Sequence, residues 1–480
     1  MLHHLARSCA VVSLGLLLAC AVNPATGRRQ LMLVSEAQEV AMGREADSGL
    51  VQELGLYDDA ELAGLVERLG AQLAAVSERP DLPWTFRVVD DPAVNAFALP
   101  GGFIYVTRGI LAHLDSEAEL AGVLGHEIGH VTARHSASQI SRSQLAQVGL
   151  GVGAILAPED VRPFLGLAQS GLGLLLLKHS RDAEREADSL GVRYMTQTGS
   201  PPAALLDVFG VLAGVSAASG GSRLPGWLST HPTPEDRQQR IGAELAALPD
   251  EARNAPRRRE ELLARLDGIV YGEDPREGFF VDSRFVHPTL RFELRFPEGW
   301  PARNARSQVS ALSPEQDAAL VLTLAAERSP GEALDAFLRR QGVESGGPWI
   351  DRVAGGAAAS RLFGVRSSSG EVRGGVAFFS HGGRVYAMIG YASARAWASR
   401  EPAARRAILS FSRLDDARLL GVQPQRLSVS RLGRATTLAQ LHARNPDAAS
   451  LDTLALLNRA DAQEGLPAGS WVKRIVGERP

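Results

Sequence analysis

The sequence predicts an α+β protein that is divided into more than one domain. With 480 residues, the chain is too long to fold around a single compact core. In its first half, apolar residues recur at spacings of three and four, which is the period of an amphipathic helix. Beyond a change of composition at residues 271–278, strand-like and helical segments alternate. We therefore expect a mainly helical domain with a small sheet, followed by further α+β structure.

Residues 1–19 have the composition of a secretory signal peptide. Arg7 supplies a positive charge ahead of the apolar run VVSLGLLLA, which is too short to span a bilayer comfortably. The run continues into LLAC, which resembles the bacterial lipobox, so we expect Cys20 to be lipidated and to become the mature N-terminus. The alternative is an ordinary signal peptide that is cleaved nearby. Ala21 in place of aspartate favours the outer membrane of a bacterial cell envelope, with the protein facing the periplasm.

Charge and cysteine content argue against two classes of protein. The net charge is −3, so no overall positive field points to nucleic acid as a partner. Cys9 and Cys20 are the only cysteines, and Cys9 lies in the segment that we expect to be removed. A fold held together by disulfide bonds is therefore excluded.

Helices and a small sheet are expected in the first part of the chain. Residues 35–80 have helical periodicity, and the strand-like segments WTFRVVD and NAFALPGGFIYVTRGIL follow them. The Pro-Gly-Gly at residues 100–102 divides the second segment into two arms, as in a hairpin. Ser116 and Glu119 form the pattern of a capping box, which predicts the start of a helix that runs to about Gln139.

The remaining segments alternate between apolar, helical and strand-like patterns. Residues 145–157 and 164–177 are apolar and rich in glycine, and each is too short to span a membrane. We expect them to form buried or interfacial helices, or a lid. A further helix is predicted over residues 180–199. Residues 279–415 predict an α+β accessory domain without an assignable chemistry, and residues 422–478 predict two helices and a terminal strand.

The stretch LGHEIGHVTARH contains a metal-binding pattern. His126 and His130 are four residues apart, so both imidazoles project from one face of the helix, one turn apart. Two neutral imidazoles at that spacing can bind one zinc ion, and a glutamate at the position of Glu127 takes a proton from the metal-bound water. A catalytic zinc site needs a third protein ligand. His135 lies about 180° further round the helix than His126, so we expect it to be a surface or structural residue.

Together with the H-E-x-x-H motif, the segment SRDAEREAD at residues 180–188 resembles a known family. This family comprises the zinc metallopeptidases of the HtpX and CAAX-prenyl-protease type, particularly their lipoprotein and periplasmic members. The resemblance implies a zincin-type peptidase domain over residues 20–272, with Glu184 as the third ligand of one zinc ion per chain. It also implies that Asp188 orients a ligand histidine. Glu186 is expected on the far, solvated side of the helix. The alternative is a charged amphipathic helix without a metal.

Two further segments support the resemblance. STHPTPEDR is similar to the family's T-H-P segment, which implies that His231 reaches the zinc region and that Arg237 supports the site. His231 either stabilises the oxyanion of the tetrahedral intermediate or occupies the open coordination position in a resting state; the alternative is an ordinary loop. NAFALPGG is similar to the family strand that pairs with an extended peptide substrate, which implies that Asn95, Ala96 and Phe97 line the groove. The alternative there is an ordinary core strand.

Residues 422–478 resemble a divergent LysM module, a small unit that often holds peptidoglycan. The similarity rests on the patterns T-L-x-x-L and L-P-A-G-x-x-V-K. Ala435, Thr436 and Thr437 stand where the module usually has Gly-Asp-Thr. The alternative is a small packing or docking domain.

The resemblance as a whole implies a lipid-anchored zinc metalloendopeptidase that cleaves extended or misfolded proteins of the cell envelope. Two other functions stay open. One is a chaperone-like or cell-wall-bound scaffolding lipoprotein in which the peptidase is latent and the C-terminal modules bind partners. The other is a cell-wall hydrolase, which the LysM-like segment suggests.

Overall fold

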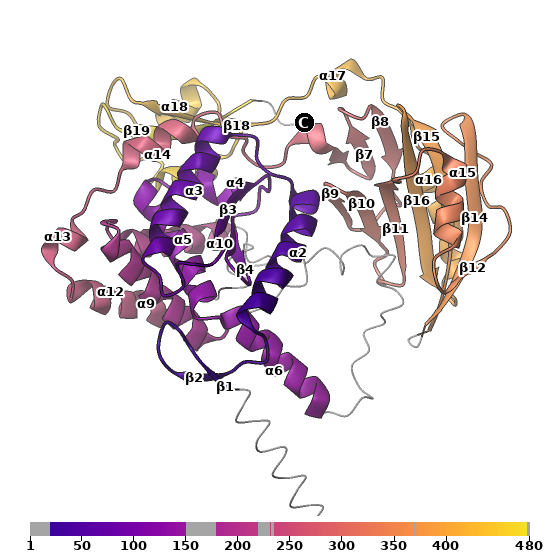
Figure 1. Ribbon diagram of the computed structural model, residues 1–480. Helices are drawn as coiled ribbons and strands as arrows, with labels where there is room; N and C mark the ends of the chain where they lie inside the picture. The colour runs from indigo at the N-terminus through magenta and orange to yellow at the C-terminus, as the bar shows by residue number, and fades with distance from the viewer. Residues whose placement is uncertain (1–19, 150–178, 219–230, 232–234, 368–369, 478–480) are drawn as a thin grey trace, which may run out of the picture.

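The computed structural model describes residues 20–149, 179–218, 231, 235–367 and 370–477. In these ranges a mainly helical half and a strand-rich half lie next to each other, and the last elements of the chain return to the helical half (Figure 1). The predicted α+β class is therefore confirmed. The expected signal peptide at residues 1–19 lies outside the described residues, as do the predicted helix at 164–177 and most of the segment 145–157.

The helical half surrounds a small three-stranded sheet. Its elements are, in chain order, β1 (Cys20–Val22), β2 (Arg29–Leu31), α2 (Glu36–Leu54), α3 (Ala60–Ala75), β3 (Thr85–Val89), β4 (Ala96–Leu99), β5 (Phe103–Thr107), α4 (Arg108–His113), α5 (Glu117–Thr132), α6 (His135–Gly149), α9 (Arg181–Gln197), α10 (Ala204–Ala218), α12 (Glu235–Ala246), α13 (Asp250–Arg253) and α14 (Arg259–Leu266). Strand β5 is central, β3 pairs with it in parallel and β4 pairs with it antiparallel. Strand β4 is thus an outer strand of the described sheet.

The turn between β4 and β5 confirms the predicted hairpin at residues 100–102. Gly101 has a φ of +83°, and a Cβ atom there would lie 2.6 Å from the Cα atom of Val40 in α2. Only glycine combines this backbone conformation with so close a contact. The turn therefore fixes α2 against the sheet.

Helix α5, which carries the H-E-x-x-H motif, is buried along its whole length. All 16 of its residues are buried. Its N-terminus begins at Ser116 as predicted, because the Ser116 side chain accepts a hydrogen bond from Glu119 N. The predicted capping box would have the Glu119 carboxylate accept from Ser116 N. The carboxylate instead accepts a hydrogen bond from Asp115 N, at 2.8 Å.

The prediction that this helix runs to about Gln139 was wrong. Helix α5 ends at Thr132, and α6 begins at His135 in a new direction. Arg134 has a φ of +60°, which a regular helix cannot accommodate. Two contacts hold Arg134 there: its Nε donates to Glu39 Oε1 at 2.6 Å, and its Nη2 donates to Val34 O at 2.8 Å. Partners far away in the sequence therefore end the helix.

The strand-rich half consists of two antiparallel sheets with two covering helices. Its elements are η1 (Pro275–Glu277), β6 (Phe279–Val281), β7 (Arg284–His287), β8 (Phe292–Arg295), β9 (Ala302–Ala305), β10 (Gln308–Leu312), β11 (Ala318–Leu324), α15 (Pro330–Leu338), β12 (Val343–Ser345), β13 (Arg352–Val353), β14 (Gly356–Ser367), β15 (Gly370–His381), β16 (Arg384–Ser393), α16 (Trp397–Leu409), β17 (Ser412–Arg413) and α17 (Ala417–Leu420). Aromatic side chains fill the core between the sheets; Phe292 stacks on Phe411 with ring centroids 4.9 Å apart. The strands and helices agree with the α+β structure predicted for residues 279–415.

The C-terminal segment packs into the core of the helical half. It comprises β18 (Arg426–Arg431), α18 (Leu438–Arg444), α19 (Leu451–Asn458) and β19 (Trp471–Val476), with β18 antiparallel to β19. Leu427 and Ile475 belong to the same buried cluster as α3, α5 and α10. The backbone of Leu427 also exchanges hydrogen bonds with residues 268–269, at 2.7 and 2.9 Å. The segment is therefore packed as an integral part of the helical half, and its LysM-like identity stays a prediction.

The buried Lys473 and the partly exposed Arg459 join this segment to the start of α5. The Lys473 ammonium lies 2.7 Å from Asp115 Oδ1 and donates to the carbonyl oxygens of Ala112 and Leu114. Arg459 donates to both carboxylate oxygens of Glu119, at 2.8 and 2.6 Å. Charged groups at such depth are tolerated because each has an opposite charge and further hydrogen-bond partners.

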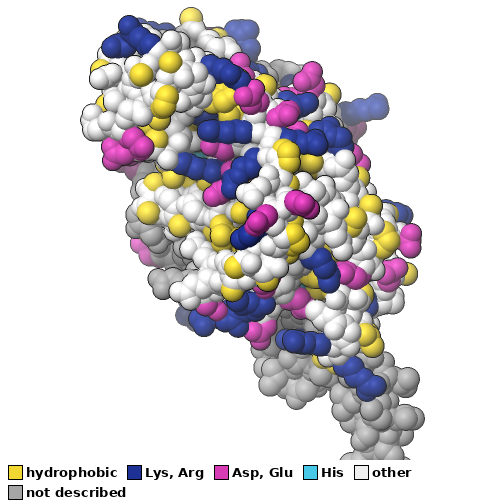
Figure 2. Space-filling model, turned by 90° about the vertical axis from the view of Figure 1, so that its left-hand side faces the viewer, with side chains coloured by type: hydrophobic (Ala, Val, Ile, Leu, Met, Phe, Trp, Pro, Cys, Tyr) yellow, Lys and Arg dark blue, Asp and Glu magenta, His cyan; other side chains and the backbone are white. Residues whose placement is uncertain are grey.

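The surface mixes both signs of charge. Figure 2 shows basic, acidic and apolar side chains interspersed over one face of the molecule, without a continuous basic area. None of the helices in the described part of the chain combines the length and the apolar character needed to cross a membrane.

We predict that Lys473→Met lowers the free energy of unfolding of the helical half by about 3–5 kcal/mol, because the substitution removes one partner of a buried ion pair. Denaturant unfolding followed by circular dichroism measures the change. Arg413→Ala is the control, since Arg413 and its partner Asp415 have side chains 63% and 71% exposed. The control should change stability by about 1 kcal/mol or less. Equal effects of the two substitutions would contradict the prediction.

Candidate metal centre

The centre is built on the buried face of α5. His126 and His130 are 0% and 2% exposed, and their Nε2 atoms lie 3.0 Å apart. The four-residue spacing places them one helical turn apart, as predicted. Glu127 is 1% exposed and lies beside them.

Helix α9 reaches the centre because it packs on α5 at glycines. A Cβ atom on Gly129 would lie 2.9 Å from Ala187 O, and one on Gly125 would lie 3.3 Å from the Cα atom of Gly191. Larger side chains at these positions would push the helices apart. The close packing brings the Glu184 carboxylate, which is 0% exposed, to the histidines. Its two oxygens lie 3.5 Å from His126 Nε2 and 3.5 Å from His130 Nε2.

These three side chains fit a zinc ion. Ligand bonds of about 2.0–2.1 Å in a tetrahedron place the donor atoms about 3.3 Å from one another. The observed separations of 3.0, 3.5 and 3.5 Å match that value. Two imidazoles and one carboxylate are also the donor set of catalytic zinc sites that leave a fourth position for water. The fit therefore rests on both distance and chemistry.

His231 completes the group of four possible ligands. Its Nδ1 lies 3.3 Å from His126 Nε2 and 2.9 Å from Glu184 Oε1, and the possible ligand atoms of the four residues all lie within 4.8 Å of one another. Its Nε2 lies 3.7 Å from Glu127 Oε1. The sequence-based expectation that His231 reaches the zinc region agrees with this geometry.

Asp188 and Arg237 surround the centre as expected from the sequence. Asp188 Oδ1 lies 3.0 Å from His126 Nδ1, on the side of the ring that faces away from the other ligands. Arg237 binds both Asp188 oxygens at 2.7 Å, and its Nη1 lies 3.0 Å from Glu184 Oε2. Phe209 covers the guanidinium, with the Cζ atom 4.8 Å from the ring centroid. One cation therefore balances two buried carboxylates.

This arrangement sets the protonation of the centre. Burial raises the pKa of Asp188, but the hydrogen bonds and charges of Arg237 and His126 together outweigh burial and hold that pKa below its ordinary value. Burial lowers the pKa of His126, yet the hydrogen bonds to Asp188 and Glu184 raise it to about 9. A metal ion that binds at neutral pH therefore displaces a proton from His126.

Two expectations about neighbouring residues were wrong. His135 is not on the opposite side of α5, because the chain turns at Arg134; its Nδ1 lies 2.9 Å from His130 Nδ1. Glu186 is not solvated; its side chain is 23% exposed and its Oε2 lies 3.0 Å from His135 Nε2. The sequence missed His179, whose ring stacks on that of His130 with centroids 4.0 Å apart. No helical period relates these positions, so no sequence pattern indicates that they meet.

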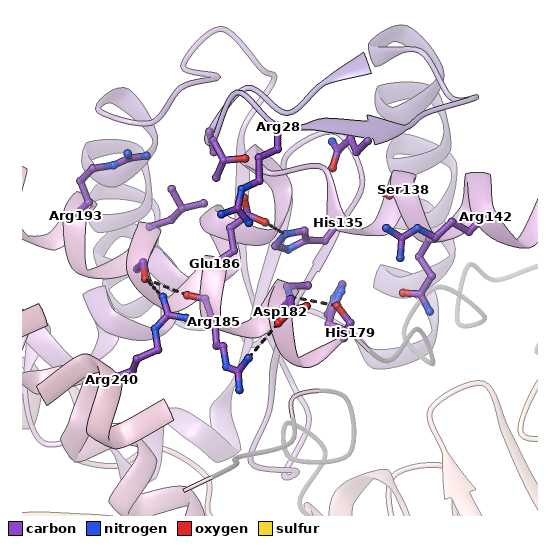
Figure 3. Close-up of a pocket in the computed structure, with 18 residues that line it drawn as sticks. Arg28, His135, Ser138, Arg142, His179, Asp182, Arg185, Glu186, Arg193 and Arg240 are labelled. Atoms are coloured by element: carbon purple, nitrogen blue, oxygen red, sulfur yellow. Dashed lines mark hydrogen bonds and ion pairs between the residues drawn. The ribbon is translucent and has the colours of Figure 1, made fainter. Parts of the chain in front are cut away.

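A cleft of about 630 Å³ opens beside this group (Figure 3). His135, His179 and Glu186 lie on its wall. It is also lined by five arginines: Arg28, Arg142, Arg185, Arg193 and Arg240. Arg185 and Arg193 are paired there with Asp236 and Glu78.

The strand expected to border the substrate groove is mostly buried. Ala96 and Phe97 are 0% and 7% exposed; Ala96 lies in the main core, and Phe97 stacks on Tyr105 with centroids 4.8 Å apart. Asn95 is half-buried just before β4. Ala96 and Phe97 are thus core residues, as in the alternative of an ordinary core strand, and β4 is an outer strand of its sheet.

We predict that Asp188→Asn weakens zinc binding about 10–100-fold, because the neutral amide is a poorer partner for His126 Nδ1. Competition with a chromophoric chelator measures the affinity. Asp182→Asn is the matched control on the same helix, since the Asp182 side chain is 92% exposed. An unchanged affinity in Asp188→Asn would contradict the prediction.

Comparison with known proteins agrees with the geometry. Residues 60–245 match the model of peptidase family M48. The chain is 32% identical to the beta-barrel assembly-enhancing protease of Yersinia pestis over 231 residues. This aligned stretch covers 46% of this chain and 47% of that protein. It is 33% identical to the mitochondrial metalloendopeptidase OMA1 of Schizosaccharomyces pombe over 223 residues. That aligned stretch covers 45% of this chain and 64% of that protein.

A third relative is the mitochondrial metalloendopeptidase OMA1 of Arabidopsis thaliana, which is 37% identical over 166 residues, 35% of this chain and 32% of that protein. The chain thus spans between a third and two thirds of the length of these relatives. The match covers the stretch that supplies His126, His130 and Glu184. Residues 60–245 of the helical half are therefore similar to peptidase family M48, and they include the three side chains that fit a zinc ion.

Proposed function

We propose that the protein is a zinc-dependent metalloendopeptidase that cleaves extended or misfolded proteins of the bacterial cell envelope. The observation that carries the proposal is the buried group of His126, His130 and Glu184 at zinc-binding distances, with Glu127 beside it. The group has the two parts that metal-assisted peptide hydrolysis needs, a set of metal ligands and a general base.

Each residue has a distinct role in this proposal. His126, His130 and Glu184 hold the zinc ion. When bound, the ion supplies a water molecule of lowered pKa and an electrophile for the peptide carbonyl. Glu127 takes the proton from the attacking water and returns it to the leaving amine. Asp188 keeps the His126 ring in place, and Arg237 holds Asp188 and Glu184.

His231 would be a fourth ligand of the zinc ion in a resting state of the proposed enzyme. Its Nδ1 is close enough to His126 Nε2 and Glu184 Oε1 to share their metal ion. A substrate would then have to displace His231 before hydrolysis. After displacement, the imidazole could still donate a hydrogen bond to the developing oxyanion.

The outer edge of β4 is the proposed docking place for the substrate. A strand edge offers backbone donors and acceptors in a row, and an extended peptide can pair with them whatever its side chains. Folded proteins have few free extended segments, so this mode of binding favours unfolded or misfolded chains. Asn95, next to β4, is the side chain best placed to contribute a polar contact.

The cell envelope is the proposed location. One relative is named for its role in beta-barrel assembly, which supports an envelope substrate. The LLAC sequence supports a lipid anchor on Cys20, facing the periplasm and in the outer membrane. A LysM-like C-terminal segment could bind peptidoglycan, although its packing into the core of the helical half equally supports a purely structural role.

The second candidate is a latent peptidase that acts mainly as a chaperone-like or scaffolding lipoprotein. The position of His231 favours this candidate, because a histidine at the fourth ligand position would exclude the substrate. The two candidates differ in whether peptide cleavage is needed in the cell.

We predict that Glu127→Gln retains zinc but cleaves unfolded casein about 10²–10⁴-fold more slowly, because it loses the general base. Zinc content is measured by atomic absorption, and cleavage by release of labelled peptides. A chelator should abolish the wild-type activity, and zinc should restore it. Wild-type protein that binds zinc without cutting casein would shift the weight to the latent candidate.

We predict that His231→Ala increases casein cleavage severalfold, because it frees the fourth ligand position. The rate is measured at saturating zinc, with Glu127→Gln,His231→Ala as the inactive control. A fall of about 10²-fold or more would instead assign His231 to oxyanion stabilisation alone.

A further inference from the structure

We infer that His135 and Glu186 are positioning residues for the zinc ligand His130, and that Asn23 of the N-terminal hairpin completes this relay. The inference rests on the proposed zinc site. It concerns a chain of hydrogen bonds that connects His130 in α5, His135 in α6, Glu186 in α9 and the hairpin formed by β1 and β2.

The first link fixes the proton of the ligand. His130 Nε2 faces His126 and Glu184, so His130 Nδ1 points away from the metal position. Nδ1 lies 2.9 Å from His135 Nδ1, and in a hydrogen bond between two ring nitrogens one must donate and the other accept. A neutral histidine that gives its Nε2 lone pair to a metal carries its proton on Nδ1. His130 is therefore the donor and His135 Nδ1 the acceptor.

The second link follows from the first. Because His135 accepts at Nδ1, its own proton is on Nε2, which lies 3.0 Å from Glu186 Oε2. His135 thus donates to the carboxylate. Figure 3 shows the two side chains facing each other on the wall of the cleft.

The third link has its direction set independently. Asn23 Oδ1 accepts hydrogen bonds from the backbone of Ala25 at 2.9 Å and of Thr26 at 3.3 Å. The Nδ2 amide must therefore point the other way, where it lies 3.1 Å from Glu186 Oε1. Both carboxylate oxygens of Glu186 thus accept a hydrogen bond. Every donor in the relay meets an acceptor, and only one assignment of the protons achieves this.

The relay gives His130 the kind of partner that His126 has in Asp188. In both cases a carboxylate orients an imidazole ligand: directly for His126, and through His135 for His130. Such partners hold the ring angle and the tautomer of the ligand. His135 and Asn23 are 8% and 3% exposed, whereas the side chain of Glu186 is 23% exposed, so bulk water reaches the relay mainly at the carboxylate.

The hairpin also supports the turn from which His135 projects. Gln30 donates to Ala133 O at 3.2 Å, and Ser141 Oγ accepts from Leu33 N at 2.9 Å. The segment directly after Cys20 therefore contacts both ends of the relay. The N-terminal hairpin therefore belongs to the surroundings of the metal centre.

A second metal ion on His130, His135 and His179 is the competing explanation of the cluster. It would require a metal at His130 Nδ1, opposite the ligand atom Nε2, so His130 would lose both ring protons and the hydrogen bond between His130 and His135 would be replaced. The hydrogen-bonded arrangement satisfies the same atoms without an ion. Zinc stoichiometry separates the two explanations.

The test uses the purified full-length chain and two readouts: zinc affinity by competition with a chromophoric chelator, and the visible absorption spectrum of the cobalt-substituted protein. Glu186→Gln keeps the shape of the side chain but can accept from only one of its two donors. Asn23→Asp keeps the turn acceptor and replaces the donor with a carboxylate oxygen. Asp182→Asn, on the same helix, is the control.

We expect Glu186→Gln and His135→Phe to weaken zinc binding about 10–100-fold and to alter the cobalt spectrum. Asn23→Asp should have a smaller effect in the same direction, and the control should stay within twofold. Wild-type affinity and spectrum in the Glu186 and Asn23 variants would overturn the inference. So would two zinc ions per wild-type chain, one of which is lost in His135→Phe.

Failure of the inference is distinguishable from failure of the proposed function. Wild-type protein that cleaves casein while Glu186→Gln binds zinc normally would overturn only the relay. Weakened zinc binding in the variants, with a wild type that binds zinc but cleaves nothing, would overturn only the peptidase proposal. Circular dichroism of the metal-free variants checks the fold. If His135→Phe alone unfolds, the Glu186 and Asn23 variants still test whether the relay supports zinc binding.

Discussion

The close packing of α9 on α5 is the constraint on which the metal centre depends. Glycines at positions 125, 129 and 191 let the two backbones approach, so that a carboxylate from one helix reaches two imidazoles on the other. Arg237 makes this approach possible electrostatically, because it binds Asp188 and Glu184 at once. Without it, two carboxylates would be buried close together with like charge, which costs several kcal/mol.

Helix α5 is also fixed at both ends by charged groups from elsewhere in the chain. At its start, Lys473 and Arg459 of the C-terminal segment hold Asp115 and Glu119. At its end, Arg79 donates to Val131 O and shares the carboxylate of Glu39 with Arg134. A helix that is buried along its whole length cannot satisfy its terminal groups with water, so these partners take the place of solvent. The same contacts keep the ligands in register with α9.

The connection between chain ends and metal centre has a consequence for the domain organisation. The N-terminal hairpin contacts Glu186, and the C-terminal strand pair lies in the same core as α5. The strand-rich half, by contrast, has its own aromatic core. The helical half is therefore completed by segments from before and after the strand-rich half, and the two halves differ in how much they contribute to the site.

Much of the fold and the centre of the site was predictable from the sequence, because these features depend on local patterns. The spacing of His126 and His130, the cap at Ser116, the glycine turn at residues 100–102 and the composition change near residue 275 all act within a few residues. The resemblance added Glu184, Asp188, Arg237 and His231, which the geometry brings together. The end of α5, the relay through His135 and Glu186, and the packing of the C-terminal segment were decided only by the tertiary structure. Their causes are contacts between residues far apart in the chain: Arg134 adopts a positive φ because Glu39 and Val34 hold it there, and that single residue turns His135 toward the metal centre.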